Sequence, residues 1–277
     1  MILRMKIFLF ILPFLLGIFS CQGQESQALK NKETVQAKDN KAWEDSSGKT
    51  IYKRFPIPIG YEIVPVAEHT WAAHLLNLPL KPSGSEVKLF DGRSKPNRHT
   101  YLAVVDLPIG KKDLHQCADA VMRLRADYLF NQGRYTDISF RLANGKTLAY
   151  GTWLDGKTPN TTNHWSYLEE VFNWANTTSL NQQLKSKSIA TLHIGDVFIT
   201  PPPPGLTYGH AIIVVNKCTN KDGKVKFMLA QSFMPAQEIQ ILDNPAHPGC
   251  PWYDLDFGQT LDTPEWDFTS SQLKTFE

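Results

Sequence analysis

The stretch that decides the fold reads Gly195-Asp-Val-Phe-Ile-Thr200, then Pro201 to Pro204 and Gly205, then Tyr208-Gly-His-Ala-Ile-Ile-Val-Val-Asn216. Two short apolar runs of β type are therefore joined by a stiff proline loop. Ile212 to Val215 are apolar without alternation, as expected of a strand that is buried on both faces. His210 opens that strand, so we expect a polar side chain at the rim of the core, where a cavity could form.

A helix about eighty residues upstream is the partner of this stretch. From Asp113 to Tyr128, apolar residues recur at spacings of three and four, which predicts one buried helical face with Asp113 as its N-cap. Cys117 then lies in the first turn. The positive end of a helix favours a thiolate, and a histidine can accept the thiol proton. Cys117 and His210 are therefore two of the parts that a cysteine nucleophile needs.

A third polar residue follows from strand pairing. Val225 to Gln231 predicts a strand that returns antiparallel to the histidine strand through a turn at Asp222-Gly223. Gln231 would then lie near the same end of the sheet as His210. We predict Cys117 as nucleophile, with its backbone N–H facing the oxyanion, His210 as general base and then acid, and Gln231 as the orienting residue.

Each of these residues also has an interpretation without catalysis. Cys117 lies on the apolar stripe of its helix, where small buried hydrophobic residues are common. His210 alone is typical of a hydrogen-bonded residue at the core rim, and Gln231 of a strand cap. Both interpretations stay open at the level of sequence.

Candidate substrate-binding residues are Arg123, Asp196 and Tyr208. The guanidinium of Arg123 suits a substrate carboxylate, or else belongs to a solvated helix face. Asp196 fits a turn equally well. The histidines show no spacing typical of metal ligands, so we expect neither a metal nor a cofactor.

The first twenty residues predict export. Arg4 and Lys6 are positive, and the apolar run Ile7 to Phe19 is too short for a comfortable membrane span, so residues 1–20 are interpreted as a secretory signal. Ser20-Cys21 resembles a bacterial lipobox, which implies that Cys21 is acylated and anchors the mature chain to a membrane of the cell envelope. Ordinary signal cleavage is the alternative. No other segment predicts a membrane span.

The rest of the chain predicts a tether and one domain. Residues 21–49 are polar and would be flexible, whereas residues 50–277 carry the apolar segments. A hairpin at Asn144-Gly145 and a helix over Trp165 to Leu184, for which an interruption near Thr177-Thr178 is an alternative, form an insertion at about 135–185. A few early strands, then helices, then an antiparallel meander indicate an α+β fold.

Charge and cysteine use limit the function further. A net charge of +2 without a basic block argues against nucleic-acid binding. Of the four cysteines, Cys218 and Cys250 remain after the lipid site and the helix thiol are assigned. In an oxidising compartment these two are candidates for a disulfide, and the sequence favours neither outcome.

A helix-borne Cys117, followed by Gly195-Asp196 and then by Gly209-His-Ala-Ile-Ile-Val214 on a strand, resembles the NlpC/P60 group of papain-like cysteine peptidases. Those enzymes cut peptide bonds in the stem peptides of bacterial cell wall. The resemblance implies a papain-like domain in which a helix carrying the cysteine packs on an antiparallel sheet carrying the histidine, with Gln231 at the third polar position. Gln116-Cys-Ala-Asp119 stands where that group has Asp-Cys-Ser-Gly.

A closer similarity covers essentially everything after the tether. It rests on four stretches: Gln116 to Tyr128, Gly195 to Ile199, Leu229 to Gln237 and Thr263 to Trp266. These resemble a family of bacterial lipoproteins that is catalogued as a domain of unknown function (number 4846). This similarity implies kinship and no activity.

Together these features predict an envelope lipoprotein with cysteine amidohydrolase or peptidase activity on peptide or amide bonds of the cell wall, and peptidoglycan as candidate partner. The alternative is a non-catalytic binding or scaffold lipoprotein with a papain-like frame. An acyltransferase that uses the same thiol would need an apolar acyl channel.

Overall fold

A computed structural model of the chain describes residues 43–205 and 207–276. The signal peptide predicted for residues 1–20, the lipid site Cys21 and most of the predicted tether lie outside the described residues. All described residues belong to one unit of the chain, Asp39–Glu277.

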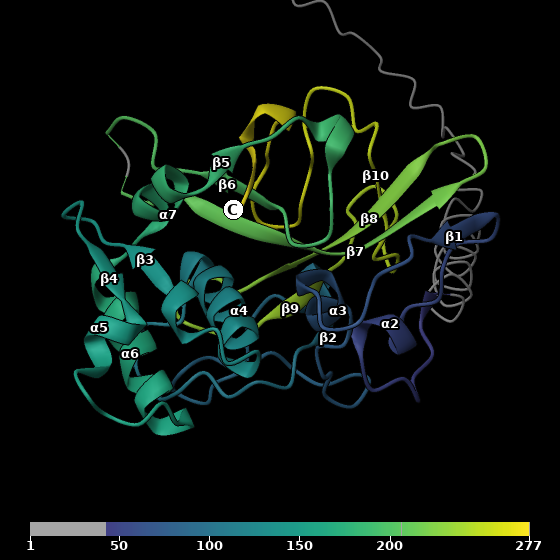
Figure 1. Cartoon of the computed structure of the whole chain (residues 1–277). Coiled ribbons are helices and arrows are strands. Elements are labelled where there is room, and N and C mark those ends of the chain that lie inside the picture. The colour runs from purple at the N-terminus through teal and green to yellow at the C-terminus, as the bar shows by residue number, and fades with distance from the viewer. Residues whose placement is uncertain (1–42, 206, 277) are drawn as a thin grey trace, which may run out of the picture. The chain divides into compact units, whose positions relative to one another are not determined.

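The main sheet is built around β7 (His210–Asn220), whose neighbours are all antiparallel to it (Figure 1). Along one edge, β6 (Val197–Thr200) pairs with its first residues and β1 (Tyr61–Ile63) with its last. Along the other edge runs β8 (Val225–Gln231). The full order is β2-β9-β8-β7-β6-β11-β5, in which β10 also pairs with β8. The remaining strands of the sheet are β2 (Tyr101–Val104), β5 (Lys185–Ser186), β9 (Gln240–Leu242), β10 (Tyr253–Asp254) and β11 (Leu273–Thr275).

Both faces of β7 are covered, because successive side chains of a strand point to opposite faces. Ala211 and Ile213 pack into the larger apolar cluster, which contains the helices. Ile212 and Val214 pack into a smaller cluster with Phe268 from the C-terminal segment. Figure 1 shows that segment, in yellow, on the side of β7 opposite α4. The unbroken apolar run of the sequence therefore predicted the burial of this strand correctly.

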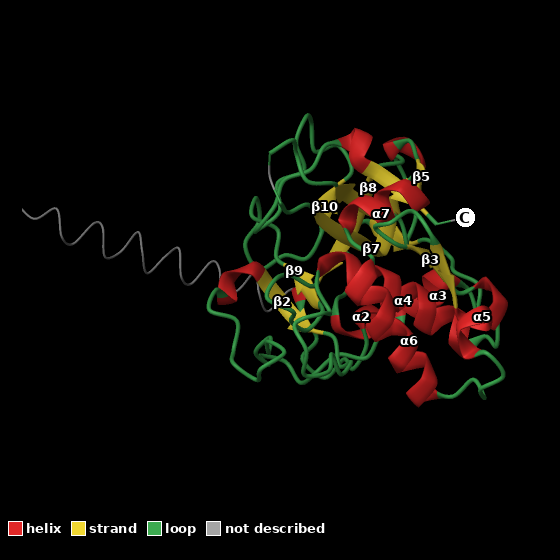
Figure 2. Cartoon of the chain, turned by 90° about the vertical axis from the view of Figure 1, so that its left-hand side faces the viewer, coloured by secondary structure: helices red, strands yellow, loops and turns green. Residues whose placement is uncertain are grey.

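The longest helix is α4 (Cys117–Asn131), which packs against β7 and contacts α3 (Trp71–Leu76), α6 (Thr161–Trp174) and α7 (Thr177–Gln183). The other elements are α2 (Ile51–Arg54), α5 (Tyr150–Leu154), the hairpin β3 (Ser139–Arg141) and β4 (Thr147–Ala149), and the 3-10 helices η1 (Arg98–Thr100), η2 (Tyr135–Asp137), η3 (Ile189–Thr191) and η4 (Ser270–Gln272). In Figure 2, helices α2 to α6 lie together below β7, whereas α7 lies level with the strands. A large antiparallel sheet with a few helices confirms the α+β class.

The start of α4 differs from the prediction. Gln116, and not Asp113, is the N-cap, so Cys117 is the first residue of the helix. The Asp119 carboxylate accepts the backbone N–H of Gln116 at 3.0 Å, which fixes the helix start there. Asp113 has another role, because its carboxylate accepts the backbone N–H of Ala236 at 2.6 Å.

The helical segment predicted over Trp165 to Leu184 forms two helices, α6 and α7, with the break next to Thr177, where an interruption was expected. Asn176 breaks it by capping α7, since its side chain accepts the backbone N–H of Ser179 at 2.9 Å. The hairpin predicted around Asn144-Gly145 is confirmed as β3 and β4.

The candidate disulfide is not formed, because Cys218 and Cys250 are both buried free thiols. The Cys250 thiol is directed to the backbone carbonyl of Trp252, at 3.8 Å, and not to Cys218. In the described ranges, no helix is long and apolar enough to cross a bilayer.

Candidate functional site

A cavity of about 320 Å³ lies at the N-terminal end of α4. Four parts of the chain line it: the start of α4 with the residues before it, the junction of α6 and α7, the loop between β6 and β7, and Met234. The lining includes Cys117, Asp119, Thr177, Tyr208 and Gly209.

The Cys117 thiol lies against the first residues of β7. Its Sγ is directed to the backbone carbonyl of Gly209, at 4.0 Å. Burial raises the pKa of this thiol to about 11, and the carboxyl group of Asp119 acts in the same direction. The backbone N–H of Ala211 and the Thr177 hydroxyl lower the pKa and only partly offset the burial. In the resting protein the group is therefore a thiol at neutral pH.

Backbone geometry explains why a helix end fits at this position. The pairing of β7 with β8 begins at Ile213, so the preceding residues of β7 have room for α4 on that edge. On the other edge, Thr200 pairs with His210 and the proline loop returns closely over it. A Cβ atom on Gly209 would lie 2.2 Å from the Thr200 carbonyl oxygen, so this position requires glycine.

The imidazole of His210 is buried in a polar and aromatic environment. Its Nε2 lies 2.7 Å from Oε1 of Gln231, and its ring packs against Phe233, Trp266 and Phe268 with centroids 4.9, 5.5 and 6.0 Å away. Its Nδ1 has no hydrogen-bond partner among the described residues. Burial lowers the pKa of His210 to about 4, so the ring is neutral at neutral pH.

Behind Gln231 lies a buried ion pair. Nε2 of Gln231 donates to the Glu265 carboxylate at 2.6 Å, and the same carboxylate pairs with the ammonium group of Lys95. Lys95 is only 5 % exposed and also donates to Oε1 of Gln240 at 3.3 Å. His210, Gln231, Glu265 and Lys95 thus form a continuous chain of contacts.

The structure brings the predicted catalytic residues to one end of β7, but not into a bonded dyad. Cys117 contacts the backbone on both sides of His210, and His210 bonds to Gln231. Among the described residues, no hydrogen bond joins the thiol to the imidazole. The ring packs on the face of the sheet that Phe268 covers.

The predicted substrate-binding residues separate. Tyr208 lines the cavity and is 59 % exposed. Asp196 lies outside the lining and is 2 % exposed, and its two oxygens accept the Lys187 ammonium at 2.7 and 3.0 Å. Arg123 also lies outside the lining, where its guanidinium donates to the Pro108 carbonyl at 2.6 Å and to Asp127 at 3.2 Å.

Sequence reasoning gave no site role to Thr177, Glu265 and Lys95, and placed Asp119 only on a solvated or cleft-facing side of its helix. Asp119 is 7 % exposed, and its Oδ1 has no partner in the described part of the chain. Burial raises the pKa of Asp119 to about 8, so a large fraction of it is protonated at neutral pH. In the sequence, the signal for Asp119 is its position two residues after Cys117. The signal for Glu265 is that it lies within the stretch Thr263 to Trp266, which resembles the family of domain of unknown function 4846.

Residues 43–205 and 207–276 contain no group of three or more histidine, cysteine, aspartate or glutamate side chains that could hold a metal ion. This part of the chain therefore offers no candidate metal centre.

Comparison with known proteins gives a family and nothing closer. No curated protein and no solved structure matches the chain. The family described as domain of unknown function 4846 matches residues 51–275, which includes all the elements that form the cavity and the His210 environment. The chain therefore belongs to the family of domain of unknown function 4846.

Proposed function

We propose that this protein is a cysteine hydrolase of papain-like arrangement that cleaves a peptide or amide bond of the bacterial cell wall. One observation carries the proposal: a free thiol at the first residue of a helix lines a cavity and lies beside the strand end that holds a histidine–glutamine pair. A nucleophile, a base and an orienting group are thus within one region.

In the proposed reaction, substrate binding first brings Sγ of Cys117 and Nδ1 of His210 together, since no hydrogen bond joins them at rest in the described residues. Sγ then attacks the substrate carbonyl carbon while Nδ1 takes the thiol proton. The tetrahedral oxyanion would face the backbone N–H of Cys117, one of the free donors at the start of α4. When the C–N bond breaks, the imidazolium gives its proton to the leaving amine and a thioester forms. Water then adds to the thioester with His210 as base, releasing the carboxylic acid and restoring the thiol.

Both groups are neutral at rest, which constrains this mechanism. Since burial raises the pKa of Cys117 and lowers that of His210, a preformed thiolate–imidazolium pair is disfavoured. Proton transfer would therefore accompany substrate binding, as catalytic hydrogen bonds often shorten only in the substrate complex. We expect the rate of thiol alkylation to rise with pH well above neutrality in the free enzyme.

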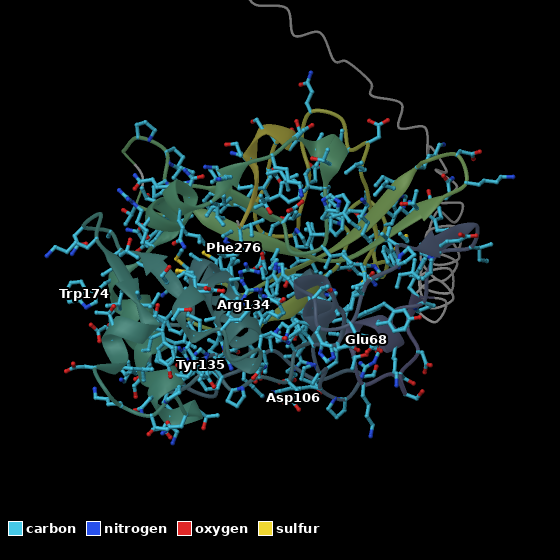
Figure 3. All side chains as sticks on the ribbon, viewed as in Figure 1. Glu68, Asp106, Arg134, Tyr135, Trp174 and Phe276 are labelled. Atoms are coloured by element: carbon cyan, nitrogen blue, oxygen red, sulfur yellow. The ribbon has the colours of Figure 1, made fainter. Side chains whose placement is uncertain are left out.

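Features at the cavity support an extended substrate such as a cell-wall peptide. Tyr208 lines it and is largely exposed, and Trp174, 61 % exposed, directly precedes the lining residue Ala175 at the end of α6 (Figure 3). Aromatic side chains are common in the walls of ligand-binding pockets, so Tyr208 suits a contact with substrate. The predicted signal sequence, the predicted lipid site Cys21 and the resemblance to NlpC/P60 peptidases favour the cell wall as the source of that substrate.

The test compares wild type with Cys117→Ala on purified peptidoglycan, with released fragments identified by mass spectrometry. Cys218→Ala is the matched control, because Cys218 is also a buried free thiol but does not line the cavity. We expect fragment release by wild type and Cys218→Ala, and none by Cys117→Ala. In parallel, a thiol-directed probe should label Cys117. Equal fragment release by all three proteins, or no labelling of Cys117, would rule out the proposed hydrolase activity.

A second candidate, a non-catalytic binding protein, is favoured by the neutral resting state of Cys117 and His210. Co-sedimentation with peptidoglycan separates the two. A binding protein would co-sediment without releasing fragments, and Tyr208→Ala would weaken co-sedimentation whereas Cys117→Ala would not.

A further inference from the structure

We propose that Glu265 and Lys95 are positioning residues that fix the tautomer of His210, so that Nδ1 is its basic nitrogen. This inference rests on the proposed function for its effect on turnover. The tautomer itself is a property of the resting protein and can be measured without any substrate.

The argument begins at the carboxylate. An ionised Glu265 can only accept hydrogen bonds, so the Gln231 atom that lies 2.6 Å from it must be the amide nitrogen. The amide oxygen of Gln231 then faces His210, at 2.7 Å from Nε2. An amide oxygen can only accept, so Nε2 carries the proton. In a neutral imidazole the other nitrogen, Nδ1, is then unprotonated and able to take a proton.

Lys95 keeps this arrangement charged. An unpaired carboxylate away from water would tend to become protonated and could then donate to Gln231. The Lys95 ammonium is itself 5 % exposed and bonds to Gln240 as well as to Glu265, so the pair is compensated within the protein. Phe233 contacts both Lys95 and His210: the ammonium lies 5.6 Å from its ring centroid and the centroid of the imidazole 4.9 Å.

Loss of the carboxylate would free the Gln231 amide to rotate by half a turn. Its nitrogen would then donate to Nε2, and the His210 proton would move to Nδ1. In that tautomer Nδ1 cannot accept the thiol proton of Cys117. We expect kcat to fall on the order of tenfold, since the bias corresponds to about one hydrogen bond, and KM to stay unchanged.

The experiment measures the ring nitrogen shifts of His210 by ¹⁵N NMR at neutral pH, together with turnover. K95M/E265M removes both charges, so that no unpaired charge is left buried, and removes the acceptor. K95M/E265Q returns a neutral acceptor at the same position. K81M/E238M is the matched control, because Lys81 and Glu238 form another partly buried ion pair that lacks contact with His210 or Gln231.

Wild type and K81M/E238M should show one tautomer, protonated at Nε2. K95M/E265M should show a mixture with a tenfold loss in kcat, and K95M/E265Q should recover much of both. A wild-type tautomer in folded K95M/E265M would overturn the proposal. If that variant does not fold, Gln231→Met, which leaves the ion pair in place, must also show a mixture; an unchanged tautomer there overturns it equally. If Cys117→Ala releases as many fragments as wild type, the proposed hydrolase activity is ruled out. The NMR result still decides separately whether Glu265 and Lys95 fix the tautomer of His210.

Discussion

The two ends of α4 hold two different kinds of buried polar cluster. At the N-terminal end, Cys117 and Asp119 line a cavity of about 320 Å³. His210 directly follows Gly209, which is another residue of the cavity wall. Toward the C-terminal end, Asp127 lies between Arg123, at 3.2 Å, and His164, at 2.8 Å, beside a second cavity of about 340 Å³. The two cavities are nearly equal in volume.

Size and a buried histidine therefore do not distinguish the two regions. Nδ1 of His164, like that of His210, has no partner among the described residues. The differences are chemical. His164 bonds directly to the Asp127 carboxylate, which also pairs with Arg123, and no cysteine lines its cavity. His210 bonds to the neutral amide of Gln231, and the Cys117 thiol lies against the carbonyl of the preceding Gly209. The nucleophile and the neutral orienting group mark the first region as the candidate active site.

The largest expected effect is on turnover. His210→Ala should lower kcat by about 10² to 10⁴, the usual contribution of a general base, whereas His164→Ala should leave kcat within a factor of two. The measurement is the rate at which each variant releases fragments from purified peptidoglycan. Equal losses in both variants would show that the comparison between the two regions has no catalytic meaning.

Stability should respond with opposite sign to removal of the two carboxylates. Asp127→Asn breaks a partly buried pair with Arg123 and should cost about 3–5 kcal/mol. Asp119→Asn should be stabilising at high pH. Burial raises the pKa of Asp119 from 3.8 to about 8 in the folded state, so the folded protein binds the proton more tightly. The stability this gives is complete below pH 3.8 and is lost as pH rises to about 8.

Urea unfolding at several pH values tests this prediction. The difference between Asp119→Asn and wild type should grow in favour of the variant from pH 4 to 8, by at most about 1.4 kcal/mol for each unit of pH. The hydrogen bond from Gln116 favours the ionised form and so lowers the upper end of this pH range without changing the slope inside it. A difference that does not depend on pH would mean that Asp119 is ionised in the folded protein.

A smaller effect is expected from the cavity wall. Gly209→Ala places a Cβ against the Thr200 carbonyl, so the proline loop must shift, at a cost of about 1–3 kcal/mol. Gly151→Ala, a helical glycine with open space around it, is the control and should be neutral or slightly stabilising. Thermal unfolding of both variants gives the answer, and a Gly209→Ala protein as stable as wild type would mean that this wall is not tightly held.

The smallest effect is expected at the exposed rim. Tyr208→Ala should raise KM a few-fold with kcat and the melting temperature unchanged, because the side chain is 59 % exposed and has little packing to lose. Tyr52→Ala, at a tyrosine 47 % exposed outside the cavity lining, should change neither constant. A KM unchanged in Tyr208→Ala would remove this residue from the substrate surface.

The sequence was most informative where local patterns decide structure. The strands β7 and β8 were predicted because an apolar run buried on both faces needs no knowledge of distant residues. The predicted start of α4 was wrong because an N-cap depends on competing hydrogen bonds. Asp113 has a side chain typical of an N-cap, but its carboxylate accepts the backbone N–H of Ala236, far along the chain.

The same limit applies to the site. The bond between His210 and Gln231 was predictable from antiparallel pairing of adjacent strands. Lys95 and Glu265 are separated from it and from each other by long stretches of chain, so no local spacing indicates that they meet. Arg123 and Asp196 were chosen as charged residues near the motif, and tertiary contacts instead use both in internal ion pairs.

The C-terminal segment has a consequence for when activity can arise during synthesis. Glu265, Trp266 and Phe268 all contact the His210 environment, and β11 (Leu273–Thr275) joins the sheet beside β6. A growing polypeptide exposes its cysteine helix long before these last residues are made. The proposed hydrolase would thus be inactive during translation, and would become active only when its C-terminal segment folds into place.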